Sequence, residues 1–413
     1  MTHLIPPHAD LGHLKKQAKR LLRAAQQAKP DALRRFSQSH PAYAKGTVDP
    51  LSFRLQEAQH VIACEYGVSS WAALTAVVGP EKSLAFERGS DLLIFSNGSS
   101  ALTLFEKVGL PGRKEEWTDV LHDGPVPVTA SVDELNRIRA KFLSGRGWAG
   151  FDGILSRFQK RDQLLARGDE FSELQIWFEH DLFDQLLLIQ IIDRLAEDPE
   201  WSAITKVFQF DRYIGRLTTE TFSAACPAPQ ALRQDQIDEA RNAWRAFRGS
   251  DPQALTKVIR EGSSSLPYLK SALLRFCEEF PWVQNGCSRT EQQILEAVHA
   301  GIQSPEKIFQ HSQAQEEAIF MGDGTFYVMI EQLTLGAHPL LTLAPGPRFL
   351  HPSIQGYGEA FRNQQLRLTE RGEQVLVGRA NRLTDLPQPY WRGGCEIRDE
   401  KGPCWDGMRK CFV

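Results

Sequence analysis

The sequence predicts an α/β protein with a doubly wound, mainly parallel sheet, flanked by an N-terminal helical module and a C-terminal winged-helix-like domain. Strand-like and helix-like segments alternate through the middle of the chain, which is typical of a parallel sheet covered by helices. Helical spacing of apolar residues dominates the first eighty residues. The predicted divisions are a basic helical module, an α/β ligand-binding domain, a helical connector, the winged-helix-like domain and a tail: 1–80, 90–225, 226–285, 286–395 and 396–413.

Length and composition describe an ordinary globular protein. The chain has 413 residues, of which 42% are hydrophobic and 24% charged, so more than one domain is expected. We find no apolar run near the roughly 18 residues of a membrane span, and the N-terminus has no apolar signal region. The sequence therefore predicts no membrane association and a cytoplasmic location. The net charge of −3 argues against bulk affinity for nucleic acid.

The N-terminal segment is helical and basic. Leu11, Leu14, Ala18 and Leu21 recur at helical spacing, and residues 1–50 contain nine Lys or Arg against three Asp. These charges form either a solvated helix face or a contact for phosphate or an acidic partner. The stretch "LGHLKKQAKRLL…EAQHVIACEYGVSSWAAL" resembles an N-terminal helical module found in front of varied bacterial domains. That resemblance implies a docking or accessory role, with a protein as the candidate partner of this module. Residues 79–90 are predicted to be a linker.

Four predicted strands in the middle of the chain each end in polar residues. The strands are expected at 92–95, 116–121, 174–178 and 204–210. The polar groups that follow them are Ser96-Asn97-Gly98, His122-Asp123-Gly124, Glu179-His180-Asp181 and Asp211-Arg212. Right-handed crossovers place such strand ends on one edge, where open α/β sheets bind ligands. The sequence therefore predicts a single site built from these groups.

The residue types at the strand ends suggest roles in catalysis and binding. A histidine with a near-neutral pKa suits a general base or a metal ligand, and carboxylates orient a base or hold a divalent metal. The small-residue turn after the first strand offers backbone N–H groups to an anion. The predicted catalytic residues are His122, Asp123, Glu179, His180 and Asp181, with His122, Glu179, His180 and Asp181 as metal candidates. The predicted ligand-binding residues are Ser96, Asn97, Gly98, Asp119, Asp184, Gln185, Asp211 and Arg212.

Structural explanations compete with each of these roles. Asp181 suits the N-cap of the helix that follows it, where a carboxylate also suits the helix dipole. Asp-Gly-Pro after His122 is a common turn, and Arg212 can form a salt bridge with its neighbourhood as readily as it can hold a phosphate. A turn at Asp123-Gly124-Pro125 does not explain His122. In the same way, an N-cap at Asp181 does not explain Glu179 and His180. A carboxylate directly after a fully apolar strand costs several kcal/mol to bury unless it is paired or coordinated.

The C-terminal part begins with a capping box, Ser288-Arg289-Thr290-Glu291. Further helices are expected from Ser304-Pro305 and over 326–333, strands at 340–343 and 365–368, and a last helix over 369–379. This order is typical of a winged helix. The seven cysteines are expected to be reduced. Three of them, in the last nineteen residues, suggest either a zinc site or free thiols in a loose tail.

Three phrases carry a family resemblance. They are "LLIFSNGSSALTLFEKVGLPG", "WTDVLHDGPVP" and "IWFEHDLFDQLLLIQIIDRL", and they resemble the bacterial family called domain of unknown function 1835. The ending "LTERGEQVLVGRANRL…PYWRGGCEI" resembles the companion domain of unknown function 3658. The resemblance spans roughly residues 90–395 and implies the domain layout rather than a mechanism. It also implies an acidic residue where Asn97 or Ser99 stands and a histidine near Glu396, so this chain is expected to bind less tightly or to bind another ligand.

Two classes of function fit these observations. The first is an α/β protein that binds a small phosphorylated or nucleotide-like ligand and acts as a hydrolase or group transferase, with His122 or His180 as base and a divalent metal as a candidate cofactor. The second is a non-catalytic, ligand-sensing regulator or scaffold that uses the winged-helix-like domain. A DNA-reading helix should present several Lys or Arg. The helix expected at 326–333 has none, which counts against DNA as a partner.

Overall fold

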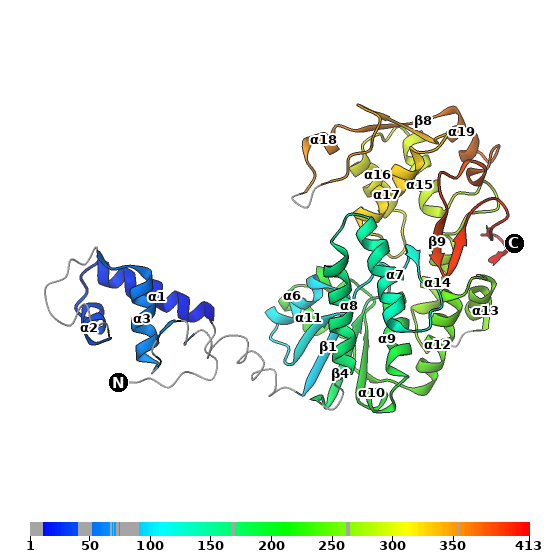
Figure 1. The fold of residues 1–413 in the computed structure, drawn as a ribbon. Helices are drawn as coiled ribbons and strands as arrows, with labels where there is room; N and C mark the ends of the chain where they lie inside the picture. Colours follow the sequence, from blue (N-terminus) through cyan, green and yellow to red (C-terminus); the bar gives the residue numbers. More distant parts are fainter. Residues whose placement is uncertain are drawn as a thin grey trace. The chain divides into compact units, whose positions relative to one another are not determined.

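The computed structural model describes residues 11–39, 52–66, 68, 70–71, 74, 91–166, 170–261, 265–352 and 356–413. The chain divides into two compact units, Met1–Asp91 and Leu92–Val413 (Figure 1). The linker expected at 79–90 lies outside the described residues. None of the helices in the described ranges has both the length and the apolar character that a membrane crossing requires.

The first unit is built from helices. Its described helices are α1 (Leu11–Gln26), α2 (Pro30–Ser39) and α3 (Leu55–Glu65). The apolar stripe predicted for the first helix is buried, with Leu14 and Ala18 fully enclosed against residues such as Phe36 and Val61. The basic side chains Lys15, Lys19, Arg20 and Arg23 are exposed. They therefore form a solvated face on this unit.

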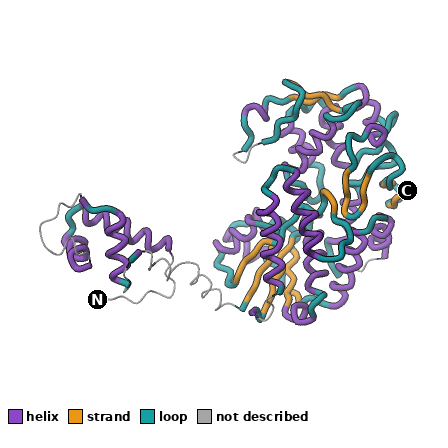
Figure 2. The backbone as a smooth tube through the Cα atoms, in the orientation of Figure 1, coloured by secondary structure: helices purple, strands orange, loops and turns teal. Residues whose placement is uncertain are grey.

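The second unit is a mixed α/β structure around a mainly parallel sheet of five strands (Figure 2). The strand order is β2-β1-β4-β5-β6, and all neighbours run parallel except β6, which is antiparallel to β5. The strands are β1 (Leu92–Ser96), β2 (Arg113–Glu116), β4 (Glu173–Phe178), β5 (Thr205–Gln209) and β6 (Gln230–Ala231).

Helices pack on both faces of this sheet because its central strands are apolar on both sides. Leu93 and Phe95 of β1 face the larger core, and Ile94 between them faces a second core with Phe105 and Phe222. The helices of this region are α6 (Ser99–Lys107), α7 (Val132–Gly145), α8 (Phe151–Leu165), α9 (Leu182–Leu195), α10 (Pro199–Ile204), the 3-10 turn η4 (Ile214–Arg216), α11 (Thr219–Ala225), α12 (Gln234–Arg248), α13 (Gln253–Glu261) and α14 (Leu269–Cys277).

The second strand differs from the expectation. The sequence predicts a strand at 116–121, but β2 ends at Glu116, and after Trp117 the chain leaves the sheet. The segment is instead held by Arg139, whose guanidinium donates to the Asp119 carboxylate and to the carbonyl oxygens of Val120 and Asp123. A buried loop of this kind shows the same apolar spacing as a strand. Consequently His122 and Asp123 do not follow a strand of the main sheet.

Residues 124–125 instead form β3 (Gly124–Pro125) in a second sheet, of order β10-β9-β3. β9 (Tyr390–Gly393) and β10 (Cys395–Ile397) lie far away in the sequence. The glycines here allow a close approach of two backbones, since a Cβ on Gly394 would lie 1.8 Å from the Arg248 carbonyl oxygen. The segment that contains Trp391 and Arg392 thus packs on β3, next to α12.

The C-terminal part contains three helices, an antiparallel strand pair and a further helix, in the order that the sequence predicts. The elements are α15 (Arg289–His299), α16 (Pro305–Gln313), α17 (Asp323–Leu333), β7 (Leu341–Ala344), α18 (Glu359–Arg362), β8 (Gln365–Leu368), α19 (Glu370–Leu376) and η5 (Arg382–Asp385). Ser288 caps α15 with the predicted capping box. α17 directs Phe326, Tyr327 and Ile330 into the core.

The expected loose tail is packed. β11 (Trp405–Asp406) and β12 (Cys411–Phe412) form a small hairpin, and Trp405 and Phe412 are buried. The Trp405 backbone exchanges hydrogen bonds with residues 281–283. All seven cysteines are free thiols, and Cys395 is buried. The buried aromatic residues of the tail supply the apolar area that holds it against the rest of the unit. The sequence prediction considered the cysteines of this segment and did not take its aromatic residues into account.

Candidate functional site

The site lies where the order of the sheet reverses. From β1 the chain moves outward to β2, and it then returns to the other side of β1 to form β4 and β5. The turns that follow β1 and β4 therefore diverge, since α6 packs on one face of the sheet and α9 on the other. In open α/β sheets this reversal opens a crevice at the carboxyl ends of the strands. The residues at this point are Asn97 after β1 and Glu179 after β4.

Three buried carboxylates meet at this point. Glu179, Asp181 and Asp184 each contribute a carboxylate oxygen, and these oxygens lie within 4.8 Å of one another. The residues are 5%, 3% and 1% exposed. Arg216 acts on Glu179 through its charge, but in the described part of the chain no Lys or Arg forms an ion pair with any of the three. Three acidic groups are therefore buried together without an ion-pair partner among the described residues.

Local hydrogen bonds hold the carboxylates in place. Asp181 is the N-cap of α9 and accepts from the Asp184 backbone N–H, as the capping interpretation predicts. Asp184 accepts from the Glu179 N–H at 2.7 Å and from the Asn97 side-chain amide at 2.8 Å. Glu179 accepts from the Ile214 N–H at 2.7 Å, which ties it to the turn after β5. The cap explains the position of Asp181 but not the convergence of three acids.

Burial raises the pKa of all three carboxyl groups. The pKa of Asp181 rises from its ordinary 3.8 to about 7, first because of burial and then because of the neighbouring Glu179 charge. Burial and the charges of Asp181 and Glu179 raise the pKa of Asp184 well above its usual range. The pKa of Glu179 is also raised by burial, against the hydrogen bonds from Ile214 and Asn97. Like charges in low dielectric oppose full ionisation, and a cation would relieve this opposition.

Several predicted binding residues surround the carboxylates. The Ser96 hydroxyl donates to the Trp177 carbonyl oxygen at 3.0 Å and joins β1 to β4. Gly98 is the N-cap of α6, so the first N–H groups of that helix start beside Asn97. The Gln185 side-chain amide donates to the Glu179 carbonyl oxygen at 2.7 Å, while its own buried oxygen has no partner. These residues thus lie at the ends of β1 and β4 or at the start of α9.

His180 stands at the accessible side of the site, in an aromatic cluster. Its ring lies 5.1 Å from that of Tyr213 and 6.0 Å from that of Tyr268, measured between centroids. Burial lowers the pKa of the half-buried imidazole, so it is neutral near pH 7. Burial and the Asp181 charge raise the pKa of Tyr213 to about 12, so its hydroxyl keeps its proton. Arg216 stacks over Tyr213 at 4.5 Å.

His122 is buried away from the carboxylates. Its ring packs edge-on against Phe183 and Phe320, and neither ring nitrogen has a hydrogen-bond partner. Burial lowers its pKa to about 4. The structure brings His122 next to α9 through Phe183, but no hydrogen bond or ion pair links it to the carboxylates among the described residues.

Asp119 and Asp123 are held by arginines. Asp119 pairs with Arg139 at 2.8 Å, and both side chains are 1% exposed. Asp123 pairs with Arg146 at 2.8 Å and with Arg392 at 3.3 Å. Burial alone would raise the pKa of Asp123, but these arginines outweigh it and the pKa is lowered. These two aspartates fix the loop and β3 rather than face the sheet edge.

Asp211 and Arg212 do follow β5, as the sequence predicts. They form an exposed ion pair with each other at 2.6 Å, which matches the salt-bridge interpretation. Asp211 acts on His180 through its charge. The sequence analysis missed Tyr213 and Arg216, although both lie just beyond this predicted strand end. Tyr268 was not predicted either. It is the N-cap of α14 and does not follow a strand, so the search for polar strand ends does not reach it.

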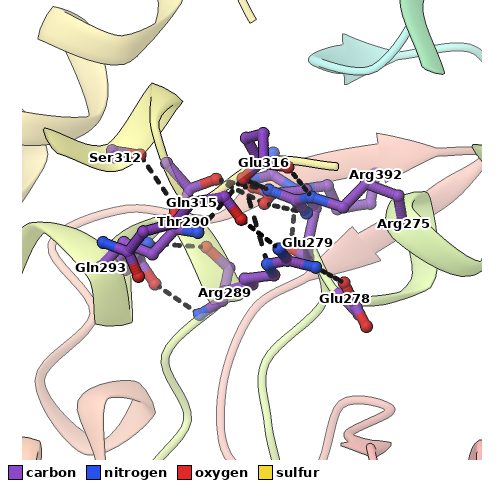
Figure 3. Close-up of polar contacts among 12 residues, drawn as sticks. Arg275, Glu278, Glu279, Arg289, Thr290, Gln293, Ser312, Gln315, Glu316 and Arg392 are labelled. Carbon is purple, nitrogen blue, oxygen red and sulfur yellow. Dashed lines mark hydrogen bonds and ion pairs between the residues drawn. The ribbon is translucent and has the colours of Figure 1, made fainter. Parts of the chain in front are cut away.

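A network of buried charges joins α14 to the C-terminal part (Figure 3). Arg275 contacts Glu279 and Glu316 at 2.7 Å each, and Thr290 donates to Glu279. Arg289 continues the network to Glu278 at 2.8 Å. A cavity of about 200 Å³ lies beside it, lined by residues that include His180, Leu182, Arg275 and Arg289. The network thus forms one wall of the space next to His180.

Comparison with known proteins adds no family to this geometry. No protein-family model matches the chain, and no curated protein matches it significantly.

Proposed function

We propose that this protein is a metal-assisted hydrolase or group transferase that acts on a small phosphorylated or nucleotide-like ligand at the carboxyl ends of β1 and β4. The observation that carries the proposal is the buried cluster of Glu179, Asp181 and Asp184, which forms no ion pair with a Lys or Arg in the described ranges. Burying charge without a partner is costly, so such a cluster is maintained where a ligand or ion compensates it.

The donor set fits a hard divalent cation. Carboxylate oxygens are the preferred ligands of Mg²⁺, Mn²⁺ and Ca²⁺, and the buried Gln185 oxygen without a partner is a further hard donor on the same helix. A bound cation would polarise a phosphoryl oxygen and neutralise its charge. The first N–H groups of α6, beside Gly98, would receive an anionic group of the ligand.

We assign the base to His180 rather than to His122. His180 lies between two of the carboxylates in the sequence, is half-buried beside a cavity and has a lowered pKa, so the neutral form is available to accept a proton near pH 7. Tyr213 and Tyr268 offer aromatic faces next to it, which suit a planar ring of a nucleotide-like ligand.

Titration with Mn²⁺ alone tests the metal site. Calorimetry at pH 8, above the pKa of Asp181, should show one ion bound per chain. Asp181→Asn and Asp184→Asn should each weaken binding at least tenfold, because each removes a charged ligand from the same centre. His180→Gln should keep Mn²⁺ affinity but lower the hydrolysis of phosphate esters.

Asp211→Asn is the matched control, since Asp211 is an exposed carboxylate at the neighbouring strand end. It should bind Mn²⁺ like the unmodified protein. Absence of Mn²⁺ binding at millimolar concentration, or equal losses in Asp211→Asn and Asp181→Asn, would refute the proposed metal site.

We further propose that the chain belongs with the domain of unknown function 1835 and 3658 proteins, with a doubly wound sheet and a winged-helix-like C-terminal part. Helices on both faces of the sheet and the order of α15 to α19 support these assignments. A DNA-reading role for that part has no comparable support. α17 carries no Lys or Arg and buries most of its large side chains. The second candidate function is therefore a non-catalytic regulator that senses a ligand, without reading DNA.

A further inference from the structure

We propose that the protein has a second ligand site, which binds a small oxyanion at the far end of α9 from the carboxylates. A cavity of about 150 Å³ lies there between α7, α8, α9 and α12. It is lined by three arginines from three helices, Arg161, Arg194 and Arg248. α9 has 14 residues, so the cavity lies roughly 20 Å from the N-cap Asp181. The proposed metal-assisted function does not require this site.

Arg194 provides the clearest evidence for a binding site. Its Nε and Nη1 atoms are buried and have no hydrogen-bond partner, although its side chain is 20% exposed overall. The nearest carboxylate oxygen belongs to Glu197 and lies 3.9 Å from Nε, beyond hydrogen-bond distance. Glu197 is itself 62% exposed, so solvent screens this contact. The guanidinium therefore offers donors that no described residue uses.

Arg248 is a second cation without an anionic contact. It donates to the Pro127 carbonyl oxygen at 2.7 Å and to the Thr129 hydroxyl at 3.0 Å, which are neutral acceptors. Burial lowers its pKa, and Asp193 opposes this shift only through its charge. These hydrogen bonds hold Arg248 in position, and its positive charge can still attract an anion bound in the cavity.

Three carboxylates also line the cavity, those of Asp162, Asp193 and Glu197. Asp162 accepts from Asn136 at 2.6 Å and lies 3.6 Å from Arg161. Asp193 pairs with Arg241 at 3.7 Å and acts on Arg194 and Arg248 through its charge. Among the described residues, none of the three carboxylates accepts a hydrogen bond from Arg194 or Arg248, so the donors of these two arginines remain open to an oxyanion.

The neighbouring groups also suit an oxyanion. α7, a helix of 14 residues, begins at this cavity with Ser131 and Val132 in the lining, so the positive end of its dipole adds to the arginines. The Trp117 and Trp244 side chains form apolar walls. Arginine binds phosphate and carboxylate groups bidentately. A cavity of roughly 150 Å³ holds a molecule about the size of benzene, so one phosphate, sulfate or small carboxylate fits.

Inorganic phosphate is the probe for this site. Isothermal titration of the full chain with phosphate at constant ionic strength should show one bound ion. Arg194→Gln should weaken this binding at least tenfold, since it removes a charged donor that makes no hydrogen bond in the free protein. For the same reason the variant should keep its thermal stability in chloride. Parallel titrations with sulfate and acetate distinguish a general oxyanion site from one that prefers phosphoryl groups.

Two variants make the result decisive. Arg157→Gln removes an exposed arginine from α8 that does not line the cavity, and it should bind phosphate like the unmodified protein. Asp181→Asn should also retain phosphate binding, which separates this proposal from the metal site. No phosphate binding, unchanged affinity in Arg194→Gln, or an equal loss in Arg157→Gln would overturn the proposal.

Discussion

Asp181 and His122 are both buried, but burial acts on them in opposite directions. Burial raises the pKa of Asp181 from 3.8 to about 7 and lowers that of His122 from 6.5 to about 4. The folded state therefore favours the neutral form of both groups. Because one is an acid and the other a base, their contributions to stability change with pH in opposite senses.

The sign of each contribution follows from proton uptake. Between about pH 4 and 7 the folded protein holds a proton on Asp181 that the unfolded chain releases, so this contribution to stability falls as the pH rises. Between about pH 4 and 6.5 the unfolded chain binds a proton on His122 that the folded protein does not, so this contribution rises with pH. Lowering the pKa of His122 from 6.5 to about 4 corresponds to roughly 3 kcal/mol.

Substitution should separate the two contributions. In urea unfolding without metal at pH 5, 6, 7 and 8, Asp181→Asn should gain stability relative to the unmodified protein as the pH rises. His122→Phe should have its greatest relative stability at pH 5 and lose that advantage by pH 7. A packing change in either variant shifts its free energy of unfolding by the same amount at every pH. Parallel pH profiles for all three proteins would therefore contradict the assigned pKa shifts.

Strand-end reasoning finds the central carboxylates because Glu179 and Asp181 follow an apolar strand directly in the sequence. The same reasoning places Asn97 and Asp184, which are 87 positions apart, at this edge of the sheet. It does not find Tyr268, which approaches His180 from a helix that begins after the sheet is complete. Such contacts depend on the strand order, which no local pattern in one sequence specifies.

Among the elements, α14 is joined by charge to the segment that follows α16, and not by apolar packing alone. Arg275 is 8% exposed and serves both Glu279 and Glu316, each of which is 2% exposed (Figure 3). Removing one partner of a buried pair leaves an uncompensated charge, which costs far more than the pair contributes.

Arg275→Met should therefore lower the free energy of unfolding by about 3–5 kcal/mol, because two buried carboxylates lose their shared cation. Arg260→Met, an exposed position on α13, should change it by less than about 0.5 kcal/mol. Chemical unfolding at pH 7 measures both. A loss in Arg275→Met no larger than that in Arg260→Met would show that the network adds no stability.

Capped helices such as α15, with its periodic apolar face, and α9, with its nearly continuous apolar run, are predicted well because local sequence determines them. β2 is not, since its residues Arg-Lys-Glu-Glu carry no apolar alternation and its place in the sheet comes only from pairing with β1. The neighbouring loop is misread for the opposite reason. Trp117 and Leu121 are buried as they would be in a strand. The chain between them is nevertheless held by hydrogen bonds from Arg139 and not by a neighbouring strand.

On the scale of the whole molecule, the two compact units have separate cores. One cluster of buried apolar residues, which includes Leu14, Phe36 and Val61, is confined to the first unit. Every other cluster lies within Leu92–Val413. The sequence predicts a linker at 79–90, and the units divide after Asp91. The finer divisions within the second unit stay predictions.

A chain of residues 92–413 alone should fold with the same melting transition as in the full protein. Its melting temperature should agree within about 2 °C, the change expected for less than 1 kcal/mol in a protein of this size. Differential scanning calorimetry of both chains measures it. A much lower melting temperature, or aggregation of the shorter chain at room temperature, would show that the first unit stabilises the second.

The parallel pairing of β3 with β9 has a consequence for synthesis on the ribosome. Asp123 and Arg392 are 269 positions apart, so one counterion of Asp123 does not exist until nearly the whole chain has been made. During that interval Gly124 and Pro125 remain an unpaired edge. The β10-β9-β3 sheet can thus form only after translation has almost ended, and until then this segment of the nascent chain lacks its final partner.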